Sequence, residues 1–154
     1  MSKTIKSIGF ILVPLMVINS CGGGSSSYKF ENTVSSVKTN IVGTWKSECI
    51  DTGDEFSKRL TKVFTKTVYT STRTLYIGAT CATYDVNSTS TWNYTIGALT
   101  SQETVEINFN SATEQVLTVV KFDKDQLYIA NNINDKTVGI RETDFSQSPA
   151  LTKQ

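Results

Sequence analysis

The chain has 154 residues, of which 38% are hydrophobic, and 15 basic and 14 acidic side chains give a formal net charge of +1. This balance excludes the extended basic surface that recruits nucleic acid, so no nucleic-acid partner is expected. The chain has no histidine, which excludes a Ser-His-Asp triad and a zinc site with His ligands. We predict no catalytic residue, no metal site and no cofactor, and we do not expect an enzyme.

The first twenty residues have the pattern of a secretory signal. Lys3 and Lys6 give a positive start, and an apolar stretch follows from Ile8 to Ile18. A permanent membrane helix is the alternative. Those residues would rise only about 16 Å as a helix, against a hydrocarbon core of about 30 Å, and Pro14 interrupts them. Residues 1–20 are therefore predicted to be a cleaved signal peptide.

A cysteine follows this segment directly. The sequence Ile18-Asn19-Ser20-Cys21 resembles the lipobox of bacterial lipoproteins, with an aliphatic residue three places before the Cys and a small residue just before it. The resemblance implies that Cys21 carries a palmitate-type acyl lipid that anchors the chain in the membrane of the bacterial cell envelope. The alternative is an ordinary signal peptide that is cleaved nearby and leaves Cys21 unmodified.

The residue after Cys21 bears on which membrane holds the anchor. In enteric-type bacteria, an Asp in that place resembles a signal for retention in the inner membrane. This chain has Gly22 instead, so the outer membrane is expected. In a Gram-positive organism the same chain would lie outside the plasma membrane.

Residues 21–40 are predicted to be the lipidated Cys and a flexible linker. The run from Gly22 to Ser27 contains only glycine and serine, and no sustained hydrophobic period follows it. The alternative is that Tyr28 and Phe30 dock on the folded domain.

Lipidation of Cys21 leaves an even pair of cysteines. In an oxidising compartment, Cys49 and Cys81 are predicted to form a disulfide. A two-Cys metal site is the alternative, but the chain offers no His to complete it.

Residues 41–145 have the pattern of β structure. Thr occurs 23 times in the chain, β-branched residues favour strands, and no segment has a convincing period of 3.6. Alternation begins at 41–49, where Trp45 and Cys49 share a face. Further strands are predicted over 58–64, 68–77, 92–96, 105–109, 114–122, 126–130 and 137–142. A loop is predicted over 78–87. Which face of 58–64 is buried stays open, because Lys62 shares its parity with Leu60 and Phe64.

Eight short strands with short connections must be antiparallel. A closed up-and-down barrel and a two-sheet sandwich are the alternatives, and the barrel is favoured because closure removes exposed strand edges. The predicted fold class is therefore all-β, an eight-stranded antiparallel barrel over residues 41–145. Residues 146–154 are predicted to be a C-terminal tail.

Two features of this region resemble a known family. Gly43-Thr44-Trp45 on the first predicted strand and Arg141 on the last are similar to the Gly-x-Trp and late Arg of lipocalins and related calycin barrels. The resemblance implies that Trp45 plugs one end of a lipocalin-like barrel and that Arg141 packs over it. We interpret both as fold residues that touch no ligand. No helix is predicted after Arg141, where a typical lipocalin has one. Gly43 to Cys49 followed by a second Cys also looks like small lipocalin-like bacterial lipoproteins of unknown function.

The barrel interior is the expected functional region. Its candidate ligand-lining residues are Trp92, Tyr94 and Phe109, although side chains could also fill an eight-stranded barrel, and the sequence leaves this open. The favoured function is the binding of a small apolar ligand. The alternative is a protein-interaction, inhibitor or envelope-maintenance module that contacts an envelope protein through loops 51–56 and 78–87.

The first of these loops carries an acidic cluster that is a candidate metal or catalytic site. Asp51, Asp54 and Glu55 stand close together on one predicted turn. A solvated loop is favoured over weak calcium binding. An enzyme built on facing carboxylates is the least favoured function, because a glycosidase needs them across a cleft.

Overall fold

The structure is a computed structural model that describes residues 31–100, 103–130 and 141–154. Within these ranges the chain forms one short helix and nine strands, so the prediction of an all-β fold is confirmed. In chain order they are α1 (Val34–Asn40), β1 (Gly43–Ser47), β2 (Ile50–Asp51), β3 (Phe56–Phe64), β4 (Val68–Ile77), β5 (Thr83–Leu99), β6 (Val105–Asn110), β7 (Gln115–Asp123), β8 (Gln126–Ile129) and β9 (Leu151–Lys153).

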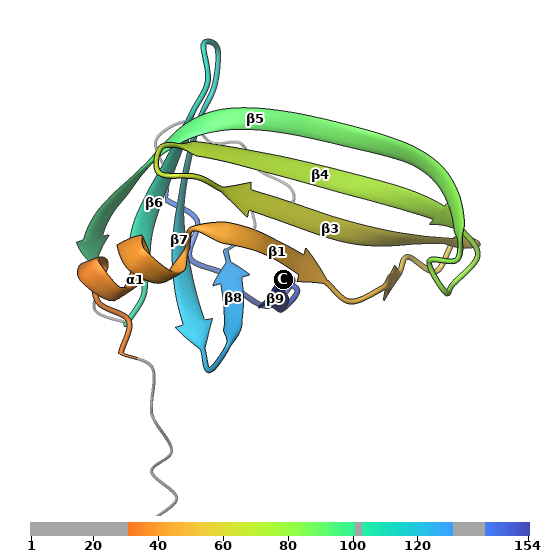
Figure 1. The fold of residues 1–154 in the computed structure, drawn as a ribbon, viewed down its shortest axis with the longest axis horizontal. Coiled ribbons are helices and arrows are strands. Elements are labelled where there is room, and N and C mark those ends of the chain that lie inside the picture. The colour runs from red at the N-terminus through yellow and green to blue at the C-terminus, as the bar shows by residue number, and fades with distance from the viewer. Residues whose placement is uncertain (1–30, 101–102, 131–140) are drawn as a thin grey trace, which may run out of the picture.

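The strands form one closed antiparallel sheet, visible in Figure 1 as a barrel seen from the side. The hydrogen-bonded order is β1-β9-β8-β7-β6-β5-β4-β3, and β1 also pairs with β3, which closes the ring. Only β2 stands outside it, paired with β3 alone among the described strands. The predicted eight-stranded antiparallel barrel is therefore confirmed.

The strand that closes the barrel is not the one predicted. Leu151–Lys153 lies in the predicted C-terminal tail, yet it forms β9 and pairs with both β1 and β8. Of the predicted last strand, residues 137–140 lie outside the described residues, whereas Arg141 and Glu142 are not in a strand. The tail was wrongly assigned because three residues with a single apolar side chain carry no readable alternation.

The predicted flexible linker is also corrected at its C-terminal end. Val34–Asn40 is helical and begins with a capping box, in which Thr33 and Ser36 each bond the other's backbone N–H. Val37 and Ile41 are completely buried, and α1 contacts β5 at one end of the barrel (Figure 1). The predicted docking of Tyr28 and Phe30 lies outside the described residues.

A further residue of the predicted linker is bonded to the barrel. The side chain of Asn32 donates to the carbonyl of Phe122 at 3.0 Å and accepts from its N–H at 2.8 Å. The amide side chain thus satisfies the backbone of β7 near its end, as a neighbouring strand would. The folded domain therefore includes residues 32–40, which the sequence assigned to the linker.

The core is aromatic and follows the predicted alternation. Val105, Ile107 and Phe109 of β6 are at most 5% exposed, whereas the residues between them are only half-buried. Trp45, Phe64 and Tyr69 join the same cluster. The cleanest period-two segment of the sequence thus lies with its apolar face in the barrel, as expected.

Three strands extend beyond the closed part of the barrel and form an arm, defined here as residues 56–60, 73–77 and 83–88 of β3, β4 and β5 (Figure 1, right). The predicted loop 78–87 is therefore too long, because β5 already starts at Thr83. Residues 83–91 are all exposed. With neither face buried, this part of β5 has no apolar alternation by which the sequence could reveal it.

Candidate functional site

A cavity of about 220 Å³ lies in the barrel among the described residues. Most of the side chains around it are apolar: Leu60, Tyr69, Trp92, Phe109, Val116, Ile129, Ala130, Pro149 and Leu151. Four polar or charged residues complete the lining: Lys62, Ser71, Thr118 and Glu142. An apolar wall with a few polar groups is the usual composition of a small-molecule site.

Strand pairing explains why these residues meet. Directly paired residues of neighbouring strands point to the same face of a sheet. The register pairs Lys62 with Ser71, and Tyr69 with Trp92. The Tyr69 ring then stacks on Trp92 at 5.6 Å and on Phe109 at 4.3 Å between centroids, which gives the cavity a rigid aromatic side.

Two of the three candidate ligand-lining residues line this cavity. Trp92 and Phe109 do, but Tyr94 does not. Tyr94 is only 7% exposed, packs edge-on against Phe64 at 5.3 Å and donates its hydroxyl to the Thr65 carbonyl at 2.6 Å. Burial raises the pKa of its phenol above the usual range. The structure therefore corrects the assignment of Tyr94, which is a core residue with its polar end bonded to a turn.

Lys62 is a lining residue that sequence reasoning did not select. In an extended strand Lys62 lies on the same face as Leu60 and Phe64, which is the sequence feature that could have indicated its inward position. A lysine on the inward face contradicts the usual burial pattern, however. The register pairs Lys62 with Trp45, which is 2% exposed. Lys62 therefore shares the inward face of β3 with its apolar neighbours.

Gly43 and Trp45 are not among the residues that line the cavity. The Trp45 indole donates to the Ile41 carbonyl at 2.7 Å, and the Lys153 ammonium lies 5.4 Å from the ring. Gly43 has a φ of +138°, and an added Cβ would stand 2.8 Å from the Lys153 side chain. The positive φ favours glycine at this position, whereas the close contact falls on the flexible end of the lysine side chain, which can move aside.

Arg141 has a different place from the one the resemblance implies. Its guanidinium donates to the carbonyls of Ile107 and Thr118 at 3.3 and 2.8 Å and forms an ion pair with Glu106 at 3.3 Å. The cation over Trp45 is Lys153 instead. Arg141 therefore links β6 and β7.

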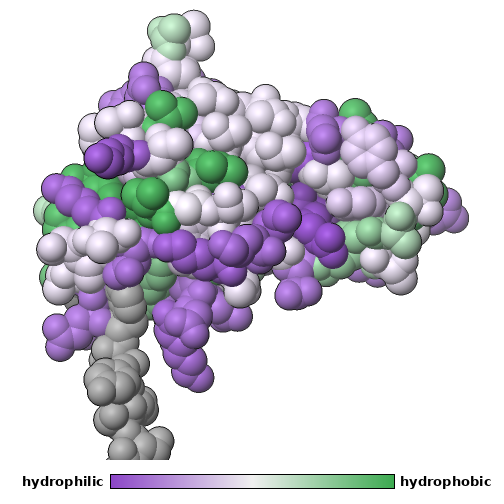
Figure 2. Space-filling view, viewed as in Figure 1, coloured by the Kyte–Doolittle hydropathy of each residue, from purple (hydrophilic) through white to green (hydrophobic). Residues whose placement is uncertain are grey.

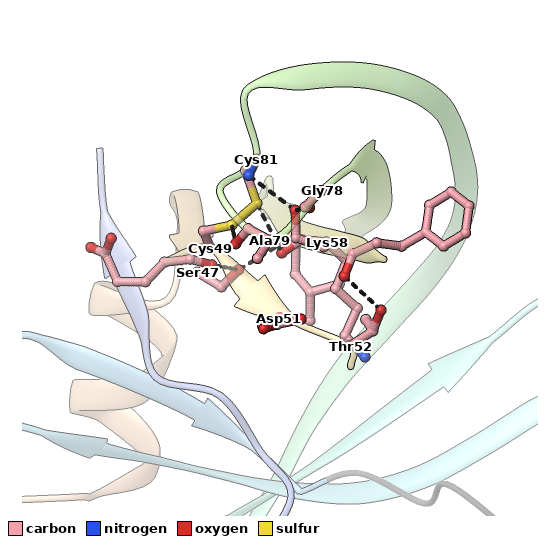
Figure 3. Close-up of a disulfide and its surroundings, with 12 residues drawn as sticks. Ser47, Cys49, Asp51, Thr52, Lys58, Gly78, Ala79 and Cys81 are labelled. Atoms are coloured by element: carbon pink, nitrogen blue, oxygen red, sulfur yellow. Dashed lines mark hydrogen bonds between the residues drawn. A yellow bond between two sulfur atoms is a disulfide. The ribbon is translucent and has the colours of Figure 1, made fainter. Parts of the chain in front are cut away.

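Cys49 and Cys81 form the predicted disulfide, with their Cα atoms 5.8 Å apart. Cys81 lies in the connection between β4 and β5, and Figure 3 shows the disulfide with Lys58, Gly78 and Ala79 around it. Ser57 supports the same corner, because its hydroxyl donates to the Gly78 carbonyl at 2.6 Å and accepts from the Cys81 N–H at 3.0 Å. The alternative of a two-Cys metal site is wrong. Cys21 lies outside the described residues.

The acidic loop next to the disulfide is solvent-exposed. Asp51 accepts from the Gly53 N–H at 2.9 Å, as in an Asx turn, and Asp54 and Glu55 are exposed. In the part of the chain that the structure describes, no three His, Cys, Asp or Glu side chains are grouped so that they could hold a metal ion.

Comparisons with models of protein families, with curated proteins and with solved structures found no match to this chain. Among residues 31–100, 103–130 and 141–154, no helix has the length and hydrophobicity needed to cross a membrane. The class that the structure defines is a closed eight-stranded antiparallel β-barrel with an internal, largely apolar cavity.

Proposed function

We propose that this protein is a lipid-anchored lipoprotein of the bacterial cell envelope whose barrel binds one small apolar ligand. The observation that carries the proposal is the cavity of about 220 Å³ with its wall of Tyr69, Trp92 and Phe109. An apolar cavity of about 150 Å³ in another protein binds benzene. The volume found here suits a ligand of one ring or a short alkyl chain.

The proposed anchor lies close in sequence to the described part of the domain. If Cys21 is lipidated, residues 22–31 separate it from Asn32, the first of the described residues whose side chain is bonded to the barrel. Ten extended residues span at most about 35 Å. The barrel would therefore act within a few tens of ångströms of the membrane surface, in reach of apolar molecules that leave it.

The binding of a short alkyl alcohol tests the proposal. Octanol would be titrated into mature protein in lipid nanodiscs, with Trp92 fluorescence as the readout and empty nanodiscs as the blank. Val116→Phe narrows the cavity and should weaken binding at least tenfold. Gln115→Phe adds the same ring at an exposed neighbour and should leave affinity unchanged. Equal affinity of both variants, or no saturable binding by the wild type, would contradict the proposal.

The exposed arm favours a second candidate function, an interaction with another envelope protein. Phe56, Ile77, Tyr84 and Val86 are 41 to 58% exposed and lie on the paired strands of the arm. The right end of Figure 2 shows hydrophobic residues scattered among polar ones. The disulfide joins Cys81, in the predicted loop 78–87, to Cys49, which lies just before the predicted loop 51–56. Phe56 and Ile77 are direct partners on β3 and β4 and form one exposed apolar pair. Exposed apolar surface of this kind is typical of protein-interaction sites.

Crosslinking in intact cells tests this second function. A photo-reactive side chain at Ile77 should capture a defined partner, whereas the same group at exposed Asp123 of β7 should not. Phe56→Ser should then abolish the capture at Ile77. If both positions give the same products, the arm is only part of the scaffold.

A further inference from the structure

The cavity wall contains one ammonium group, that of Lys62. Lys62 Nζ donates to Ser71 Oγ at 2.6 Å and lies 5.7 Å from the centroid of the Tyr69 ring. Ser71 and Tyr69 both line the cavity, as Lys62 itself does. The positive charge of this half-buried lysine is therefore held at the cavity wall, beside the aromatic side.

This ammonium has only neutral partners among the described residues. It has three N–H donors, of which the Ser71 hydroxyl takes one, and no ion pair joins it to a carboxylate in the described part of the chain. A partly desolvated cation with unused donors is stabilised by an anion placed beside it. Lys62 borders the cavity, so a ligand there would lie beside its ammonium group.

Glu142 is the other charged residue of the lining, and it does not neutralise Lys62. Its Oε1 accepts from the Asp144 N–H at 3.1 Å, so the carboxylate is held by its own segment of the chain. No ion pair connects it with Lys62 in the described part of the structure. The cavity thus presents one cation at the strands β3 and β4, which lie side by side in Figure 1. Its one carboxylate, Glu142, is bonded within its own segment, and most of the remaining wall is apolar.

We infer that the ligand of this cavity is a small amphiphile with a single anionic group, of the class of short-chain or single-ring carboxylates. Its oxygens accept from Lys62 Nζ and from the Ser71 hydroxyl, and its apolar part lies against Tyr69, Trp92 and Phe109. Charge-assisted hydrogen bonds of this kind are the strong ones in a partly dry site. The inference rests on the proposed binding function and adds to it the chemical class of the ligand.

A matched pair of ligands tests the inference without any mutation. Octanoate and octanol have the same alkyl length and differ in the anionic group, and both would be titrated into mature protein in nanodiscs at pH 7. Wild-type protein should bind octanoate at least tenfold more tightly than octanol. Equal affinity would overturn the inference and leave the proposed function standing. If neither ligand binds, the proposed function and the inference both fail.

Two lysine variants assign the preference to one residue. Lys62→Met removes the charge with little change in length and should reduce octanoate affinity at least tenfold while octanol affinity is kept. Lys58→Met makes the same change on the same strand, outside the cavity lining, and should keep the preference for octanoate. Lys62→Arg keeps a cation in place and should retain most of the preference for octanoate. A preference unchanged in Lys62→Met would overturn the assignment.

Discussion

Trp45 contacts residues near both ends of the described part of the chain. Its indole bonds the carbonyl of Ile41 at the end of α1, its ring packs on Phe122 at 5.5 Å between centroids, and Lys153 of β9 lies over it. The sequence predicted a buried Trp45 from its alternation on the first strand. It did not predict that Lys153 would lie over the ring, because a single lysine near a chain end has no pattern.

Replacement of this indole should be costly. Trp45→Ala is expected to reduce the free energy of unfolding by about 3 to 5 kcal/mol, because a large buried side chain and its contacts are lost. Lys46→Ala, at the exposed neighbour, should change it by less than about 0.5 kcal/mol. Urea unfolding of the three proteins measures this. A loss below about 1 kcal/mol in Trp45→Ala would mean that the ring contributes little to the core.

Tyr94 should make stability depend on alkaline pH. Burial raises the pKa of its phenol above the ordinary value of 10.0. Between pH 10 and the raised pKa, the folded state therefore keeps the phenol proton that the unfolded chain has lost. The contribution of this group to the free energy of unfolding is complete well below pH 10 and disappears as the pH rises through the raised pKa. The free energy of unfolding of the wild type should fall with rising pH in this alkaline range, and that of Tyr94→Phe should fall less steeply. Parallel pH profiles of the two proteins would contradict this account.

At the scale of elements, the strands with one buried face were the predictable ones. The predicted strands 58–64, 68–77, 105–109 and 114–122 match β3, β4, β6 and β7 to within two residues. The failures had physical causes: α1 and β9 are too short to show a period, and the outer part of β5 buries neither face. The cavity could not be predicted, since its polar part depends on the inward facing of Lys62.

The short strand β9 should matter more to stability than its length suggests. Leu151 is 2% exposed and lies between its partners Ser47 of β1 and Leu127 of β8. Leu151→Ala is expected to cost about 2 to 5 kcal/mol. The adjacent Thr152→Ala, at an exposed position, serves as the control. Similar urea midpoints for the two variants would contradict the closure of the barrel by β9.

The disulfide should stabilise the arm and the chain as a whole. The two cysteines are 32 residues apart, and in the chain-entropy model closing such a loop contributes about 3 to 4 kcal/mol. The double variant Cys49→Ser, Cys81→Ser should therefore unfold at a clearly lower denaturant concentration. The wild type under reducing conditions should approach the same midpoint. A midpoint equal to that of the oxidised wild type would contradict this expectation.

At the scale of the whole molecule, the proposal joins an anchor, a short tether and a cavity. Cys21→Ser should block lipidation, so that the protein is released in soluble form or remains an uncleaved precursor. Fractionation and mass measurement of the N-terminal peptide distinguish the two results. Normal processing with unchanged membrane retention would contradict lipid anchoring. That result would not bear on the proposed binding of a ligand in the cavity.

The most direct test of the central claim is the position of a bound ligand. Intermolecular nuclear Overhauser effects between the alkyl protons of octanoate and assigned side chains of the protein would provide it. We expect contacts with Trp92 and Phe109, which line the cavity, and none with Tyr94. Contacts confined to Phe56 and Ile77 at the arm tip, or no contacts at saturating octanoate, would contradict a binding site inside the barrel.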